Sequence, residues 1–128
     1  MFYLKKDSES SVIKYPITQQ IKDRYNITDD MLESVAITFS MVDSNTGRFR
    51  IANESGYIIV NSDLEPTLCK YELGFKFNKK HTFKTGRYLG EFVLDFLNPE
   101  YGCGSIKLPN VEYLDIIITD TLTKTTVI

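Results

Sequence analysis

The stretch Cys69-Lys70-Tyr71-Glu72-Leu73-Gly74-Phe75-Lys76-Phe77-Asn78 alternates between two kinds of position. Every odd residue is apolar, and every even residue is polar or glycine. Because successive side chains of an extended chain point to opposite faces, the pattern predicts a β-strand with one buried and one wet face. Cys69 is expected on the buried face of that strand.

The same period of two recurs along most of the sequence. It predicts long strands over residues 35–42, 87–96 and 114–118, and Ile117 makes the last of these apolar on both faces. A strand that is covered on both sides, or docked against a partner, has this composition. Shorter strands are predicted over residues 2–5, 12–18, 48–52, 56–61 and 124–127. Pro16 cannot donate a ladder hydrogen bond, so its strand should be an edge strand or a broken one.

A single segment favours a helix. Thr28 is a good N-cap, and Asp29 and Asp30 would lie at the positive end of a short helical turn over residues 28–33. With about seven to nine short strands and regularly spaced turns, the chain is predicted to be an all-β sandwich. Its 128 residues suit one domain, residues 1–128, with a core over about residues 2–119 and a C-terminal tail over 120–128.

Charge and hydropathy narrow the classes of function. Fifteen Lys and Arg are dispersed among 17 Asp and Glu, and the net charge is −2. Nucleic-acid surfaces need clustered positive charge, so no nucleic-acid partner is expected. The N-terminus has no apolar signal-peptide region and no apolar run approaches membrane length, so we expect synthesis in a cytosol and no membrane partner.

Asp43-Ser44-Asn45-Thr46-Gly47 could be a calcium loop or a hairpin turn. Asp43, Asn45 and Glu54 fall at ligand positions one, three and twelve of a calcium loop. Gly47, however, stands at the fifth position, normally a ligand, and Arg48 stands where the sharp-turn glycine belongs. Asx residues followed by glycine between two strands are typical of a hairpin turn. We therefore predict a turn and no metal site.

No catalytic constellation is apparent. His81 is the only histidine, has two lysine neighbours, Lys79 and Lys80, and is expected in an exposed loop. No G-x-S-x-G elbow or phosphate-binding glycine loop is present. Cys69 and Cys103 are expected as a buried thiol and a loop thiol, and a bridge between them is the alternative. We predict no catalytic, cofactor-binding or metal-binding residue, no cofactor, and no enzyme activity.

The aromatic residues divide into two groups. Five phenylalanines lie on the inward rows of the predicted strands and should form the core: Phe39, Phe75, Phe77, Phe92 and Phe96. Several tyrosines are less tied to one face, and tyrosine is enriched at protein interfaces. The absence of tryptophan weakens, without excluding, a sugar-binding platform.

In their order, the segments of this chain resemble the immunoglobulin-like domain at the N-terminus of phage baseplate upper proteins and related tail or fibre adaptor proteins. The resemblance covers roughly residues 2–119 through short motifs. They are Tyr3-Leu4-Lys5-Lys6-Asp7, Asn26-Ile27-Thr28, Val35-Ala36-Ile37-Thr38-Phe39-Ser40-Met41, the Asp43 to Gly47 turn, Ile51-Ala52-Asn53, Gly56-Tyr57-Ile58-Ile59-Val60, Thr85-Gly86-Arg87-Tyr88-Leu89-Gly90-Glu91-Phe92, Leu108-Pro109-Asn110 and Leu114-Asp115-Ile116-Ile117-Ile118.

The resemblance implies an immunoglobulin-like sandwich and a role in the virion. Family members usually continue into a coiled coil or receptor-binding module, whereas this sequence ends at Ile128. We therefore expect a docking, adaptor or decoration subunit of the tail, neck or baseplate, made in the bacterial cytoplasm and incorporated into the virion. Its partners would be other virion proteins and copies of itself in a symmetric assembly. The alternatives are a carbohydrate-binding, host-recognition module and a head decoration protein.

The expected partner interface combines tyrosines with the apolar C-terminal tail. Its residues are Tyr3, Tyr15, Tyr101, Leu122, Val127 and Ile128. The tail could add a strand to a neighbour's sheet edge, where main-chain hydrogen bonds provide affinity. Removal of residues 121–128 should then abolish incorporation into the particle.

Overall fold

The computed structural model describes residues 1–61, 69–96, 104–109 and 112–120 of the chain. This part contains nine strands and three short helices. In chain order they are β1 (Phe2–Lys5), β2 (Val12–Pro16), α1 (Gln19–Tyr25), α2 (Asp29–Leu32), β3 (Val35–Asp43), β4 (Phe49–Ser55), β5 (Tyr57–Val60), β6 (Tyr71–Lys76), α3 (Lys79–Thr82), β7 (Gly86–Phe96), β8 (Gly104–Leu108) and β9 (Leu114–Thr119).

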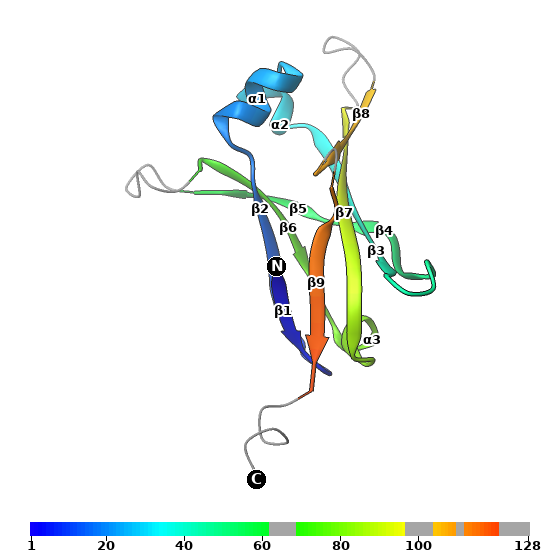
Figure 1. The fold of residues 1–128 in the computed structure, drawn as a ribbon. Helices are drawn as coiled ribbons and strands as arrows, with labels where there is room; N and C mark the ends of the chain where they lie inside the picture. Colours follow the sequence, from blue (N-terminus) through cyan, green and yellow to red (C-terminus); the bar gives the residue numbers. More distant parts are fainter. Residues whose placement is uncertain (62–68, 97–103, 110–111, 121–128) are drawn as a thin grey trace.

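The strands form two sheets that pack face to face. The larger has the order β1-β9-β7-β3-β4, with β8 also paired to β7, and the smaller has the order β2-β6-β5. All pairs are antiparallel except β1 with β9. Helices α1 and α2 lie at one end of the sandwich and α3 at the other (Figure 1). The sets β2-β6-β5 and β9-β7-β3-β4 follow the B-E-D and G-F-C-C′ order, so the predicted all-β, immunoglobulin-like sandwich is confirmed.

Strands β8 and β9 share one edge of β7. Phe92 of β7 pairs with Leu108 of β8, and Gly90 pairs with Leu114 of β9. From Gly90 to Phe92 the chain advances two residues, whereas from Leu108 to Leu114 it advances six. The pairing along this edge of β7 is therefore interrupted between β8 and β9. The Leu108–Pro109 bond that closes β8 is cis.

The phenylalanines predicted for the core are all buried. Phe39 of β3 stacks on Phe75 of β6, with ring centroids 4.7 Å apart, and lies 4.9 Å from Phe92 of β7. Phe77 meets both Phe39 and Phe75 edge to face. These rings join the two sheets through direct aromatic contacts in the centre of the core.

Tyr88 fixes the corner at which the chain enters β7. Its ring is fully buried, and its hydroxyl donates to the carbonyl oxygen of Lys84 at 2.9 Å. A tyrosine at the start of this strand, bonded to the backbone a few residues upstream, is the tyrosine corner of immunoglobulin-like sandwiches. The hydrogen bond holds the segment between α3 and β7 against the core of the sandwich.

The hairpin between β3 and β4 is formed as predicted. Asp43 Oδ1 accepts hydrogen bonds from the backbone N–H groups of Asn45 and Thr46, at 2.8 and 3.3 Å. Gly47 has φ of 71°, a left-handed conformation that glycine adopts without steric cost. The prediction for Pro16 is also confirmed, because β2 is an edge strand of the smaller sheet.

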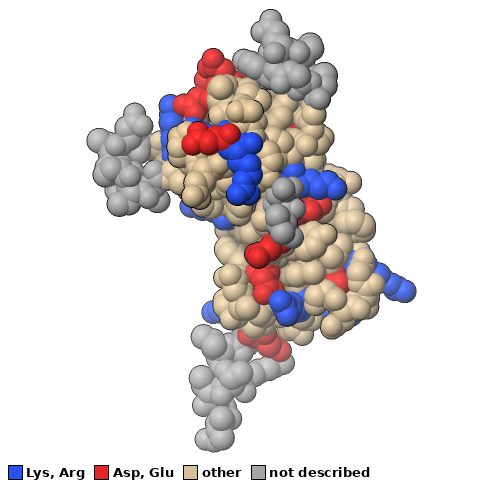
Figure 2. Space-filling view, turned by 45° about the horizontal axis from the view of Figure 1, so that its top comes forward, with Lys and Arg blue, Asp and Glu red and all other residues tan. Residues whose placement is uncertain are grey.

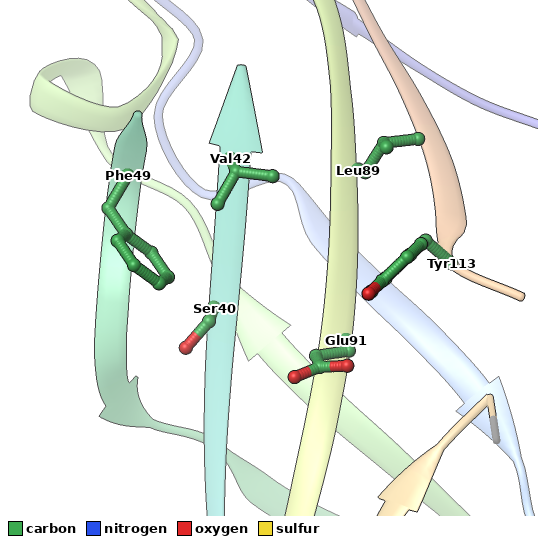
Figure 3. A pocket seen from close by; sticks show the side chains of 6 residues that line it. All are labelled: Ser40, Val42, Phe49, Leu89, Glu91 and Tyr113. Carbon is green, nitrogen blue, oxygen red and sulfur yellow. The ribbon is translucent and has the colours of Figure 1, made fainter. Parts of the chain in front are cut away.

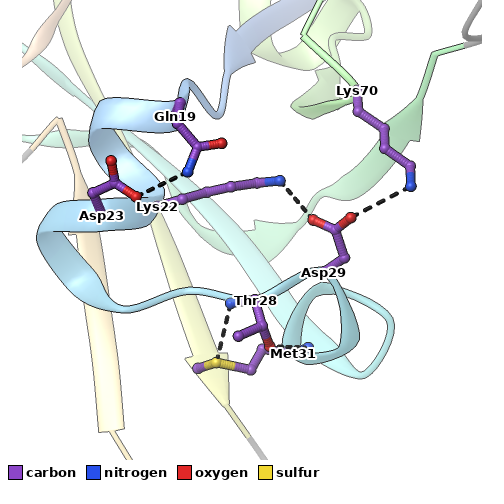
Figure 4. A network of polar contacts seen from close by, with 7 residues as sticks. All are labelled: Gln19, Lys22, Asp23, Thr28, Asp29, Met31 and Lys70. Carbon is purple, nitrogen blue, oxygen red and sulfur yellow. Dashed lines mark hydrogen bonds and ion pairs between the residues drawn. The ribbon is translucent and has the colours of Figure 1, made fainter.

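The helices are partly as expected. Thr28 caps α2 as predicted, and its hydroxyl accepts from the Met31 N–H. α1 was not predicted from the sequence. Figure 4 shows how Asp29, the first residue of α2, ties both helices to the smaller sheet. Its carboxylate binds the ammonium of Lys22 on α1 at 2.5 Å and that of Lys70, next to β6, at 3.3 Å.

Three expectations need correction. His81 does not lie in an exposed loop: it belongs to α3 and is 2% exposed, because Asn78 caps this helix and turns the imidazole inward. Cys69 is half-buried, because it precedes β6, which begins two residues later, and its thiol is free. Cys103 lies outside the described residues. Gly104–Leu108, where no strand was predicted, forms β8 on the edge of β7 that β9 leaves open. The predicted strand over residues 124–127 also lies outside the described residues.

Candidate functional site

The outer face of the larger sheet carries a row of apolar side chains. Val42 of β3 pairs with Leu89 of β7 on one side and with Phe49 of β4 on the other. Paired residues of neighbouring strands point to the same face of a sheet. Because Tyr88 and Met41, the neighbours of Leu89 and Val42, are buried in the core, this row faces outward.

A shallow groove of about 280 Å³ lies along this row. It is lined by Ser40, Val42, Phe49, Leu89, Glu91 and Tyr113. In Figure 3 the rings of Phe49 and Tyr113 stand at its two sides, with the shorter side chains between them. Phe49 is 65% exposed and Tyr113 is 57% exposed, although both are large apolar groups. The groove therefore presents aromatic surface to solvent on a rigid sheet.

Ser40 and Glu91, which both line the groove, differ in how available their polar atoms are to a ligand. Ser40 Oγ donates to Asn53 Oδ1 at 3.2 Å and accepts from the Asn53 N–H at 2.9 Å, so both of its functions are used. Among the described residues, Glu91 has no such partner. Its carboxylate is therefore available to a ligand in the groove.

The same face continues toward β1. Arg87 donates through Nε and Nη2 to both carboxylate oxygens of Asp115, at 2.8 and 3.0 Å, and these hydrogen bonds raise the pKa of the guanidinium. Ile117 pairs with Arg87 on one side and with Tyr3 on the other. Tyr3, a predicted interface residue, is 64% exposed and therefore shares this face with Phe49 and Tyr113.

The other predicted interface residues are not brought together here. Tyr15 is half-buried and packs against the core, where burial raises the pKa of its hydroxyl. Tyr101, Leu122, Val127 and Ile128 lie outside the described residues. The prediction of an interface built on the C-terminal tail therefore remains a prediction.

His81 forms the closest approach to an acid–base pair. Its Nδ1 accepts from the Asn78 N–H at 3.1 Å, so in the neutral ring Nε2 carries the proton and donates to Glu54 Oε2 at 2.9 Å. Both ring nitrogens are thus engaged, and neither faces a nucleophile. The pair anchors α3 to β4, which is a structural role.

Acidic and basic side chains are mixed over one face of the molecule. On the face in view in Figure 2, acidic and basic side chains are interspersed with large uncharged areas. Within the described part of the chain, no three His, Cys, Asp or Glu side chains are close enough to hold a metal ion. In that same part, no helix has the length and apolar composition needed to cross a bilayer.

Comparison with known proteins adds no relative. No protein-family model, no curated protein and no solved structure matches this chain. What the chain does is therefore inferred from its geometry and from the resemblance of its sequence segments.

Proposed function

We propose that this chain is a non-enzymatic docking or adaptor subunit of a bacteriophage virion, and that it acts through protein–protein contacts. The observation that carries the proposal is the outer face of the larger sheet, where Phe49 and Tyr113 are exposed beside an apolar groove. Neighbouring virion proteins and further copies of the chain are the proposed partners.

Physical chemistry favours this face as the contact surface. Aromatic rings bury much area at little entropic cost and are enriched in interface centres. The row from Leu89 through Val42 to Phe49 lies on paired strands, so it needs no reordering before contact. A preorganised face loses little conformational entropy on binding.

The virion location is supported by two features together. The first is the order of the sequence segments that resemble phage baseplate and adaptor domains. The second is the immunoglobulin-like strand order of the two sheets. Such domains hold assemblies together through surface complementarity, which the exposed face could provide.

The test is photo-crosslinking in assembled particles of the phage that encodes the chain. A photoreactive residue at position 49 should join the chain to another virion protein or to a second copy. The same residue in place of Val60, which is 63% exposed on β5 of the other sheet, should give far less of that product. Equal yields from both positions would refute this face, and particles that lack the chain would refute the virion role.

A carbohydrate-binding module is the second candidate. The Tyr113 ring and the Glu91 carboxylate lie near one another in the groove (Figure 3), and sugars bind to aromatic faces flanked by polar groups. The mostly apolar lining and the engaged Ser40 hydroxyl favour protein contact instead. Saturation-transfer NMR with host surface glycans should give no signal that depends on Tyr113, and a signal lost in Tyr113→Ala would favour this alternative.

A further inference from the structure

A second pocket, of about 300 Å³, adjoins the groove. Two elements form it: the β3–β4 hairpin, and the segment between α3 and β7. Its lining residues are Asp43, Thr46, Arg48, Phe49, Arg50 and Lys84. A backbone hydrogen bond from the Ser44 N–H to the Arg87 carbonyl, 3.0 Å long, joins the hairpin to the start of β7, which directly follows that segment. Phe49 lines both the groove and this pocket, so the two are adjacent.

Arg50 is positioned by the backbone of β4. Met41 and Val42 are consecutive on β3, yet they pair with Ile51 and Phe49, so Arg50 is an extra residue in a β-bulge. Bulges redirect a side chain and are common beside functional sites. The guanidinium carbon lies 4.4 Å from the ring centroid of Phe83 and 5.9 Å from that of Tyr88, which fixes the orientation of the group.

Positive charge is in excess in the pocket, with three basic side chains and one acidic side chain in its lining. Among the described residues, Arg48, Arg50 and Lys84 have no carboxylate within ion-pair distance. The one acid in the pocket, Asp43, already accepts backbone hydrogen bonds through Oδ1. Arg50 Nε is also shielded from solvent without an acceptor, and a buried donor left unpaired is costly.

We infer that Arg48, Arg50 and Lys84 form a carboxylate-binding pocket, and that it receives an acidic side chain of the polypeptide whose apolar side chain fills the neighbouring groove. This inference rests on the proposed docking function and specifies the partner chemistry. A carboxylate would supply the missing counter-charge in charge-assisted hydrogen bonds. The shared Phe49 ring requires the acidic and apolar groups to be close together on the partner.

The test uses the whole chain, labelled with nitrogen-15, and small probes. Sodium succinate is titrated while the Arg50 Nε–H resonance and the backbone amides of residues 46–50 are followed, with sodium chloride at equal ionic strength as reference. We expect saturable shifts with succinate. Arg48→Gln and Lys84→Gln change exposed residues that should not affect folding, and each should weaken succinate binding at least about fivefold.

Matched variants separate the pocket from general charge. Lys14→Gln removes one positive charge from the exposed side of β2 and should leave the affinity unchanged. Arg50→Lys keeps the charge but removes the Nε–H and the planar stacking, so binding should weaken. No shift beyond chloride, or equal weakening in Lys14→Gln and Lys84→Gln, would overturn the inference.

Two further outcomes are decisive. A response to sodium phosphate without one to succinate would overturn the assignment to a carboxylate partner. Crosslinking from position 49 in particles, combined with no succinate binding, would refute the pocket and leave the docking function standing. Succinate binding without that crosslinking would refute the docking function instead.

Discussion

At the scale of single residues, Gly90 of β7 allows side chains of the two neighbouring strands, β3 and β9, to pack closely over it. A Cβ atom at this position would lie 2.9 Å from both Phe39 Cζ and Ile116 Cδ1. Neither side chain can move freely, because both are fully buried. The phenylalanine cluster therefore requires the smallest residue at this point of β7.

Gly90→Ala should lower the free energy of unfolding by about 1–3 kcal/mol, the usual cost of overpacking. Urea denaturation followed by circular dichroism measures the change. Gly104→Ala is the matched control, because a Cβ there would meet no atom within 4 Å. Equal stability of the two variants would contradict the close packing at Gly90.

Tyr88→Phe removes one hydroxyl and keeps the buried ring. The Lys84 carbonyl then loses the hydrogen bond of the tyrosine corner, so the free energy of unfolding should fall by about 0.5–1.5 kcal/mol. Tyr25→Phe offers the opposite case, since the buried Tyr25 hydroxyl has no partner among the described residues. Thermal unfolding of both variants should show a loss for Tyr88→Phe alone.

The sequence pattern misplaces particular side chains for identifiable reasons. Period-two alternation assigns Phe49 and Ile51 to the same face, yet Ile51 is 1% exposed and Phe49 is the most exposed ring of the groove. The bulge at Arg50 reverses the alternation between them, and the local sequence does not predict this bulge. His81 is misjudged because its lysine neighbours suggest solvent, whereas helix α3 sends the lysines outward and the imidazole inward.

At the scale of elements, the long strands were predictable because each buries one face. The shorter elements depend on pairing or capping. β8 is defined by its pairing with the edge of β7, which a local sequence pattern does not predict. The sequence does contain a signal for α1, because threonine and asparagine are common residues at helix ends. Thr18 caps its N-terminus, and Asn26 at its C-terminus adopts a left-handed conformation with φ of 55°. Its seven residues are too few to show a clear helical period.

The ion pairs of α1 and α2 predict a pH dependence of stability. The hydrogen bond from Lys22, with a smaller one from Lys70, lowers the pKa of Asp29 in the folded state. A lowered folded-state pKa stabilises the fold at neutral pH, and this contribution is lost as the pH falls through the folded pKa. Because the side chain is 43% exposed, the contribution should not exceed about 1 kcal/mol.

Asp29→Asn should therefore be less stable than the unchanged chain at about pH 7, and the difference should shrink as the pH is lowered toward about 3. Chemical denaturation over this pH range measures it. Asp30→Asn removes an equal charge from the same helix turn without these ion pairs, and so controls for the helix dipole. A difference that is constant with pH, or shared by Asp30→Asn, would contradict the network.

At the scale of the whole molecule, the two sheets divide structural and contact roles between their faces. The inner faces meet through Phe39, Phe75 and Phe92, which makes the sandwich rigid. The outer face of the larger sheet holds the groove, and its hairpin edge holds the cationic pocket. Alternation could predict the inner faces, because burial selects hydrophobicity. It could not predict the outer site, because that site depends on cross-strand register and on two bulges in β4.

If the aromatic contacts between Phe39, Phe75 and Phe92 are what joins the two sheets, the sheets should unfold together. Phe39→Ala removes the ring that contacts both sheets and should cost about 3–5 kcal/mol, a large part of the 5–15 kcal/mol typical of a domain. Hydrogen exchange in increasing guanidinium would follow amides of β6 in one sheet and of β7 in the other. Both sets should lose protection at the same guanidinium concentration, and Phe39→Ala should lower that concentration equally for both.

Phe49→Ala, which removes an exposed ring, should leave that concentration nearly unchanged. Separate transitions for the two sheets would mean that each is stabilised mainly by its own contacts, and the rigid support argued for the docking face would be lost.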